Sequence, residues 1–232
     1  MKRFIYSAAM CAVIQGCSSG APNETAASSK TSDLYVLTSR LWGSTIPVCW
    51  ENDSAGDATQ RQWVRDEVYR TWSFVSNVSF TDWGHCSGAA SDHLKMYIND
   101  SQPNTPDLGT DNRGVTHGLT LNFTFMNWST SCQSTIESCI KFITVHEFGH
   151  VLGFAHEQNR PDTPMSCNQA SGDNGDTTFG SWDLNSVMNY CNPVWNNGGQ
   201  LSVTDVAGAQ NYYGRGPRYT AAIAGNANPA LL

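Results

Sequence analysis

The feature that most constrains this chain is a group of three histidines in the segment HEFGHVLGFAH, at His146, His150 and His156. His146 and His150 are four residues apart, so on a helix they share a face and can both point an imidazole at one ion. Glu147 lies one position further round, within reach of a water beside that ion. Gly153 can adopt a positive φ, end the helix and turn the chain back. That turn would bring His156 round as a third ligand.

Three neutral histidines that leave one position open for water are the ligand set of a catalytic zinc site. The alternative is a core-facing helix with incidental histidines, but it leaves Glu147, Gly153 and the gathering of half of the chain's six histidines unexplained. We therefore expect one zinc ion per chain, with Glu147 as the general base. The remaining histidines show no ligand spacing and are expected on the surface or in loops: His85, His93 and His117. For His117, a substrate contact is a minor alternative.

The N-terminal segment has the pattern of an export signal. Lys2 and Arg3 precede an apolar stretch that is too short to span a bilayer. The following IQGC resembles the lipobox of bacterial lipoproteins, which predicts a signal peptide over residues 1–16 and a lipid on Cys17. An ordinary signal cleaved a few residues later is the alternative. Residues 17–33 are small and polar and are expected to form a flexible tether. The protein is then a cell-envelope lipoprotein or secreted, with a lipid as its only membrane contact.

Export changes how the cysteines are interpreted. An even number in an exported protein predicts disulfides, and no C-x-x-C spacing supports a zinc–thiolate site. Six cysteines follow Cys17: Cys49, Cys86, Cys132, Cys139, Cys167 and Cys191. Six cysteines allow about fifteen pairings, and the sequence alone leaves the choice open. Proximity along the chain favours the pairs Cys132–Cys139 and Cys167–Cys191, and Cys49 with Cys86 would then remain.

Charge and periodicity indicate one folded domain over residues 34–217. The net charge of −7 argues against a nucleic-acid partner, and we expect a monomer. Apolar residues at helical spacing or in alternation predict helices over residues 60–76, 134–154 and 203–214, and strands over residues 45–50, 78–83, 94–99 and 119–125. The tail, residues 218–232, has no periodicity, and disorder is expected there.

The complete motif H-E-x-x-H-x-x-G-x-x-H resembles that of the metzincin zinc peptidases. Those enzymes place a methionine turn below the zinc, and SVMNY supplies Met188. Glu157 directly after the third histidine, and Tyr190 two residues after the methionine, are similar to the astacin family. A matrixin-like peptidase is the alternative within the clan, and these two residues favour the astacins over it.

The resemblance implies an α/β fold of mixed α+β type with two lobes. The upper lobe, to about residue 152, would hold a five-stranded twisted mixed sheet and two long helices, and an irregular C-terminal subdomain would follow. By resemblance, Tyr190 ligates the zinc at rest and later donates to the oxyanion, Met188 packs beneath the metal, and Glu157 contacts a trimmed N-terminus. Asn189 departs from the family, which has histidine there. No aspartate of the family's propeptide switch precedes Leu34, which puts that mode of activation in doubt.

These observations predict an exported zinc endopeptidase that acts on proteins or peptides. The alternative from another class is a surface binding or adhesion lipoprotein that keeps a structural zinc site. Glu147 argues against that alternative, because a structural site needs no base.

Overall fold

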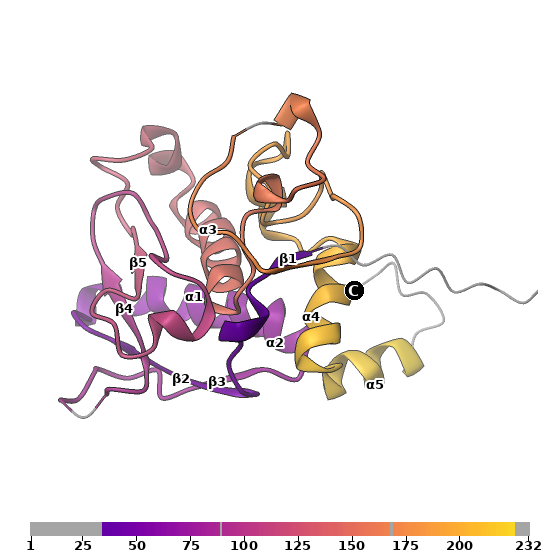
Figure 1. The fold of residues 1–232 in the computed structure, drawn as a ribbon. Coiled ribbons are helices and arrows are strands. Elements are labelled where there is room, and N and C mark those ends of the chain that lie inside the picture. Colours follow the sequence, from indigo (N-terminus) through magenta and orange to yellow (C-terminus); the bar gives the residue numbers. More distant parts are fainter. Residues whose placement is uncertain (1–33, 89, 168, 226–232) are drawn as a thin grey trace, which may run out of the picture.

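The structure is a computed structural model that describes residues 34–88, 90–167 and 169–225 (Figure 1). The expected signal peptide, Cys17 and the tether lie outside the described residues. Over the part of the chain that is described, no helix is both long and apolar enough to cross a bilayer.

A four-stranded sheet forms the frame of the upper lobe. Its strand order is β3-β2-β4-β5, and all three pairings are parallel. Its strands are β2 (Thr45–Trp50), β3 (Ser79–Thr81), β4 (Leu94–Ile98) and β5 (Leu119–Leu121). All four strands fall within the stretches predicted as strands from the sequence, although β5 is shorter than expected. It ends early because Asn122 Oδ1 accepts hydrogen bonds from the backbone N–H groups of Thr124 and Phe125, at 3.0 and 2.7 Å, and turns the chain.

The mixed α/β class is confirmed, but the described residues contain no fifth strand in this sheet. The edge beyond β5 carries a single antiparallel bridge, in which Asn104 and Thr120 exchange two backbone hydrogen bonds of 2.8 and 3.1 Å. Pro103 and Pro106 flank that bridge, and proline has no N–H to extend a ladder. The antiparallel pairing expected of a mixed sheet is therefore reduced, among the described residues, to isolated bridges, at Asn104–Thr120 and at Leu94–Arg113.

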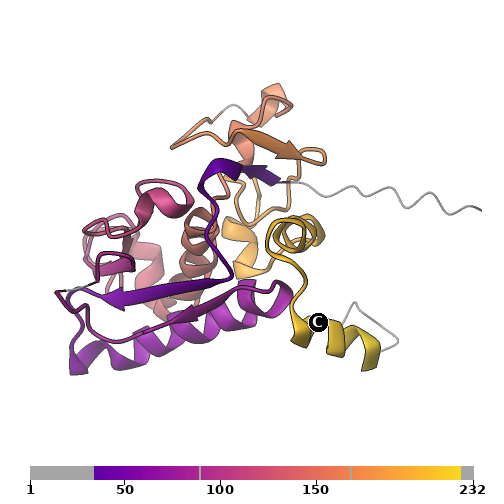
Figure 2. The same cartoon turned by 60° about the horizontal axis from the view of Figure 1, so that its bottom comes forward.

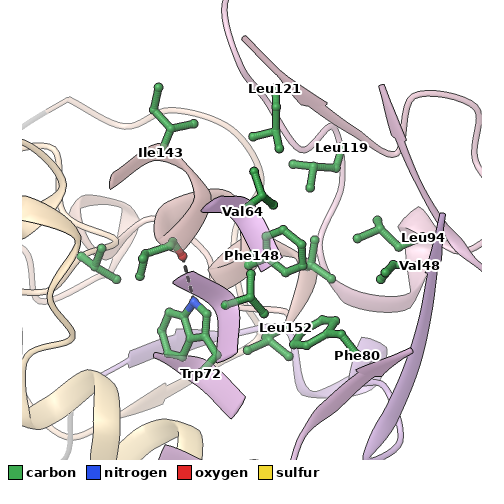
Figure 3. Packing of buried hydrophobic residues seen from close by; sticks show 14 of the residues in the cluster. Val48, Val64, Trp72, Phe80, Leu94, Leu119, Leu121, Ile143, Phe148 and Leu152 are labelled. Carbon is green, nitrogen blue, oxygen red and sulfur yellow. Dashed lines mark hydrogen bonds between the residues drawn. The ribbon is translucent and has the colours of Figure 1, made fainter. Parts of the chain in front are cut away.

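The two long helices are present, and their buried faces meet the sheet in one core. The helices of the upper lobe are α1 (Ala58–Arg70), α2 (Trp72–Val75) and α3 (Ile136–Val151). Val64 and Val68, four residues apart on α1, are both buried. Figure 3 shows Val64 and Phe148 among side chains from the sheet. Trp72 Nε1 donates to the Val145 carbonyl at 2.8 Å, and this hydrogen bond connects α2 to α3.

After α3 the chain is mostly irregular, as expected for the second lobe. A two-stranded antiparallel sheet pairs β1 (Leu34–Val36) with β6 (Thr177–Phe179), so the start of the described chain belongs to this lobe (Figure 2). α4 (Val203–Tyr213) begins with a capping box between Ser202 and Asp205. Short 3-10 segments connect the elements: η1 (Thr38–Arg40), η2 (Ala55–Asp57), η3 (Gly109–Asn112), η4 (Thr130–Ser134), η5 (Glu157–Asn159), η6 (Met165–Cys167) and η7 (Trp195–Gly199), the last of which contains left-handed residues.

The prediction of a disordered tail is wrong for residues 218–225. They belong to α5 (Pro217–Gly225), which starts at a proline, a residue favoured in the first turn of a helix. The ring of Tyr219 meets the ring of Phe74 edge-on, with 5.9 Å between centroids. α5 therefore packs against α2, a contact that cannot be predicted from the composition of the tail.

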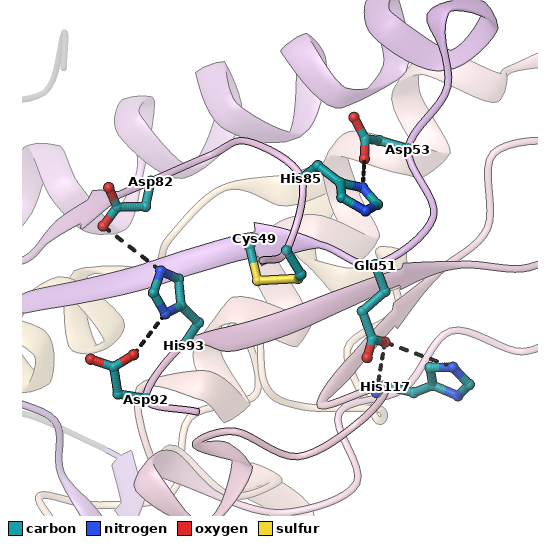
Figure 4. The surroundings of a disulfide bond; sticks show 9 residues. Cys49, Glu51, Asp53, Asp82, His85, Asp92, His93 and His117 are labelled. Atoms are coloured by element: carbon teal, nitrogen blue, oxygen red, sulfur yellow. Dashed lines mark hydrogen bonds and ion pairs between the residues drawn. A yellow bond between two sulfur atoms is a disulfide. The ribbon is translucent and has the colours of Figure 1, made fainter. Parts of the chain in front are cut away.

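All three expected disulfides are formed. Cys49–Cys86 joins β2 to the loop before β4 (Figure 4), Cys132–Cys139 joins η4 to α3, and Cys167–Cys191 joins η6 to the segment after the methionine turn. The third bridge therefore fixes two irregular segments of the second lobe to each other.

Candidate active site

The three histidines of the sequence motif converge in the structure. His146 and His150 lie on the last turns of α3, and their Nε2 atoms are 3.1 Å apart. Gly153 has a φ of 88° and ends the helix, as predicted. The chain then turns back, and His156 brings its Nε2 within 3.2 Å of both others. Among the described residues, these three form the only cluster of possible metal ligands.

Backbone carbonyls fix which nitrogen of each ring faces the centre. The three Nδ1 atoms lie 2.7–2.8 Å from the carbonyl oxygens of Val187, Phe154 and Ser171. A carbonyl can only accept, so each Nδ1 carries the proton and each Nε2 presents a lone pair. Three lone pairs that face one another at this distance need a cation between them.

Zinc fits this donor set. Zn–N bonds of 2.0–2.1 Å in a tetrahedron place neighbouring nitrogens about 3.3 Å apart, close to the observed spacing. Burial lowers the pKa of His146 to about 3 and also lowers the pKa values of His150 and His156. The rings therefore stay neutral at physiological pH, which is the protonation state that metal ligation requires.

Glu147 is buried beside this cluster, and its position depends on a residue that the sequence did not single out. Its Oε2 accepts a hydrogen bond of 2.9 Å from the Thr105 hydroxyl. Burial raises the pKa of Glu147 to about 7, although the bonds from Thr105 lower it. A carboxyl with a pKa near neutral is suited to take and return a proton. Thr105 lies in a loop rich in Pro, Asn and Asp, so no periodic signal could have marked it.

Met188 packs beneath the histidines against a glycine whose role the sequence did not reveal. A Cβ on Gly149 would collide with Met188 Sδ and would lie 3.4 Å from the Trp72 ring. Asp205 holds the methionine turn to α4, because its carboxylate accepts from Ser186 Oγ at 2.7 Å and from the Val187 N–H at 2.9 Å. The same Val187 orients His146, so this packing and the ligand geometry are linked.

Tyr190 lies over the histidine cluster and remains 43% exposed. Its ring centroid is 4.3 Å from that of His156 and 5.3 Å from that of His146. Its backbone N–H donates to Gln158 Oε1 at 3.0 Å. Burial, followed by the nearby Glu147, raises the pKa of the phenol above its usual value. The hydroxyl is therefore a proton-bearing donor at neutral pH.

Glu157 and Asn189 hold the second lobe beneath the site. Glu157 is fully buried, and its Oε1 accepts from the Asp183 N–H at 3.0 Å and lies 3.4 Å from Arg160 Nε. Burial raises the pKa of Glu157 to about 8, although Arg160 lowers it. Asn189, at the position where a histidine was expected, donates to the Asp183 carbonyl at 2.7 Å and accepts from the Cys191 N–H at 3.0 Å. It thus braces the turn through hydrogen bonds.

The other three histidines lie around the Cys49–Cys86 bridge and pair with carboxylates (Figure 4). His85 contacts Asp53 at 2.6 Å, and His93 contacts Asp92 at 2.8 Å. His117 stacks on Tyr97, and its backbone N–H donates to Glu51. None of the three lines the cavity beside Glu147, as expected for surface and loop residues.

That cavity has a volume of about 290 Å³ and is lined by His146, Glu147 and Tyr190, among others. It places the carboxylate, the phenol and one histidine around a space that can hold part of a peptide.

Residues 130–169, which include the whole histidine segment, match the family model described as Astacin (Peptidase family M12A). Of the solved structures, myroilysin has 20% sequence identity and a TM-score of 0.56, over 78% of this chain and 98% of that chain. High choriolytic enzyme 1, a hatching-enzyme zinc protease of the medaka Oryzias latipes, has 17% identity and a TM-score of 0.47, over 76% and 95% of the two chains. No curated protein sequence matches significantly.

The myroilysin likeness bears on the fold, and the family match covers the three histidines and Glu147 but not Tyr190. The histidine cluster adds a donor set that fits zinc. Taken together, the matched segment and the converging histidines are similar to the zinc site of the astacin peptidases, and the fold is similar to that of myroilysin.

Proposed function

We propose that the protein is an exported zinc endopeptidase in which His146, His150 and His156 hold one zinc ion and Glu147 is the general base. The observation that carries the proposal is the meeting of three Nε2 lone pairs directly beside a buried carboxylate. A structural metal site has no use for such a carboxylate, and burying one is unfavourable.

Zinc bound at these histidines would polarise the scissile carbonyl and lower the pKa of a water to about 7. Glu147 then accepts the proton of the attacking water and delivers it to the nitrogen of the leaving amine. The Thr105 hydroxyl holds Oε2 of this carboxylate at 2.9 Å, so the base is oriented before substrate enters.

Tyr190 supplies the second proton donor of the site. Its phenol remains protonated at neutral pH, and it can donate to the carbonyl oxygen as negative charge develops there. A donor of this kind is worth about 3–4 kcal/mol in the transition state. Since part of the ring is exposed, it can move without disturbing the core.

The substrate is proposed to bind as an extended peptide along the edge at Asn104. This segment pairs inward with Thr120, while its neighbours Gln102 and Pro103 line the cavity. A peptide that runs along a sheet edge forms backbone hydrogen bonds that are independent of its sequence.

Export of the protein is supported by its three disulfides, because such bonds persist in oxidising compartments. Attachment through a lipid on Cys17 is a proposal from the sequence. Labelling cells with a radioactive fatty acid tests it, since Cys17→Ser should abolish incorporation. Incorporation that persists in this variant would refute the anchor.

The peptidase itself is tested by comparing casein cleavage by the parent and by Glu147→Gln. We expect the variant to bind zinc and fold normally, but to cleave about 10²–10⁴ times more slowly. Glu137→Gln is the matched control, because Glu137 is an exposed glutamate on the same helix that pairs with Lys141. Glu137→Gln should cleave casein like the parent, and a chelator should stop cleavage by both the parent and Glu137→Gln.

Equal cleavage by Glu147→Gln and the parent would refute Glu147 as the base. A parent that binds zinc but cleaves no protein would instead favour a surface binding lipoprotein with a structural metal.

A further inference from the structure

The cavity beside Glu147 has apolar walls supplied by separate parts of the chain. They are Pro103, Trp128, Ile143 and Trp195. Ile143 is buried on α3, and Trp128 packs with Phe125 at a centroid distance of 6.1 Å. Trp195 differs from these, because its side chain is 43% exposed and has room to meet a ligand.

Besides His146, Glu147 and Tyr190, the polar side chains of the lining are amides: Gln102, Gln169, Asn189, Asn192 and Asn196. Among the described residues that line the cavity, none is Lys or Arg, and Glu147 is the only acid. Lys141, further along α3, is paired with Glu137. The side chains of the lining therefore offer hydrogen bonds and aromatic surface, but no lysine or arginine that could pair with an acidic side chain.

The loop that carries Trp195 has an unusual backbone. Asn196 and Asn197 have φ values of 45° and 49°, and Gly198 and Gly199 follow with 59° and 70°. A run of left-handed residues that includes two non-glycines is strained, and such strain tends to persist at functional sites. Asn192 Nδ2 donates to Asn197 Oδ1 at 3.2 Å, which fixes the loop from within.

The Cys167–Cys191 bridge holds the start of the same loop, next to Tyr190. A loop that is bridged at one end and locked in a left-handed turn at the other presents Trp195 and Asn196 to the cavity in one orientation. Such rigid presentation favours selective recognition, because little ordering remains to be done on binding.

We propose that this cavity is a specificity pocket for a large uncharged side chain, preferably aromatic, beside the scissile bond, and that Trp195 is its specificity-determining residue. The proposal rests on the peptidase function proposed above. An aromatic ring can stack on Trp195 and bury apolar surface. An acidic side chain would lose hydration in the pocket and meet no Lys or Arg among the residues of this chain that line it. A basic side chain would meet a single carboxylate, Glu147, which already accepts a hydrogen bond from Thr105.

The test uses the mature protein and a series of peptides that differ at one residue on either side of a mapped cleavage site. At one of these positions, we expect kcat/KM for Phe or Tyr to exceed that for Asp, Glu, Lys and Arg by about tenfold or more. Trp195→Ala should reduce the ratio of Phe to Ala peptides about fivefold or more, chiefly through KM. Val194→Ala, an exposed neighbour that does not line the cavity, is the matched control and should keep the ratio.

Gln102→Lys and Gln102→Glu test the charge argument at an exposed position of the lining. The lysine variant should raise the relative cleavage of acidic peptides severalfold, and the glutamate variant that of basic peptides. A flat profile or a preference for charged residues in the parent, or a Phe-to-Ala ratio unaffected by Trp195→Ala, would overturn the proposal.

Binding of the same peptides to Glu147→Gln, measured by calorimetry, separates this proposal from the peptidase function. If the parent cleaves nothing, the peptidase proposal fails, and binding of unstructured peptides that differ at one central residue still decides on the pocket. Tighter binding of Phe peptides that is lost in Glu147→Gln/Trp195→Ala would support it, and equal binding of all peptides would overturn it.

Discussion

Replacing Gly149 by alanine should destabilise the protein although alanine is the better helix former. Gly149 lies between the two histidines on α3, and a Cβ there would collide with Met188 Sδ, lie 3.0 Å from Met188 Cε and 3.4 Å from the Trp72 ring. Overpacking of this kind costs about 1–3 kcal/mol. The better helix propensity of alanine offsets about 0.5–1 kcal/mol. We expect a net loss of about 1–2 kcal/mol in the free energy of unfolding.

The displacement should also reach the metal ligands. Val187, next to Met188, accepts the 2.8 Å hydrogen bond from His146 Nδ1. Loss of such a supporting bond typically lowers metal affinity by about 10–100-fold. Gly149→Ala should therefore weaken zinc binding by up to this factor without touching a ligand.

Thermal unfolding of the metal-free protein and a competitive zinc titration measure the two effects. For a domain of this size, the loss in stability corresponds to a fall in Tm of about 2–8 °C. Gly43→Ala is the control, since nothing lies within 4 Å of its added Cβ. Adding Met188→Ala to Gly149→Ala should recover part of the loss, as a coupling between the two sites. An unchanged or raised Tm for Gly149→Ala would refute the close packing.

Three further predictions follow from hydrogen bonds in and near the site. Tyr190→Phe should lower kcat by about 10²–10³-fold with little change in KM, and an unchanged kcat would remove Tyr190 from the reaction. Thr105→Val removes a hydrogen bond that lowers the pKa of Glu147. Because the base must be ionised, the acid limb of the pH profile of kcat/KM should move to higher pH. An acid limb that stays in place would contradict this role of Thr105. Trp72→Phe removes the 2.8 Å indole hydrogen bond to the Val145 carbonyl, which keeps its bond within α3. The loss should cost about 0.5–1.5 kcal/mol in urea unfolding, and an unchanged free energy of unfolding would contradict a stabilising role for this bond.

The parts of the site that could be predicted from the sequence depend on local spacing. The histidines on α3 follow helical periodicity, and Gly153 is a turn residue whose positive φ is observed. The disulfides agree with the pairing favoured by proximity along the chain, although the sequence left other pairings open.

The parts that could not be predicted depend on contacts between distant segments. Thr105 reaches Glu147 from 42 residues away, and the sequence around it signals only a loop. Gly149 resembles any helical glycine until Met188 is placed against it. The fifth strand, expected from family resemblance, is reduced to one bridge at Asn104, because the neighbouring prolines cannot extend the ladder.

The central claim is that three imidazoles of this chain hold a zinc ion beside Glu147. X-ray absorption at the zinc K-edge, with metal analysis of the purified protein, tests it most directly. The account predicts one zinc per chain, with nitrogen ligands at about 2.0–2.1 Å that include three imidazoles. A folded protein that binds no zinc, or a zinc with sulfur ligands at about 2.3 Å, would contradict it.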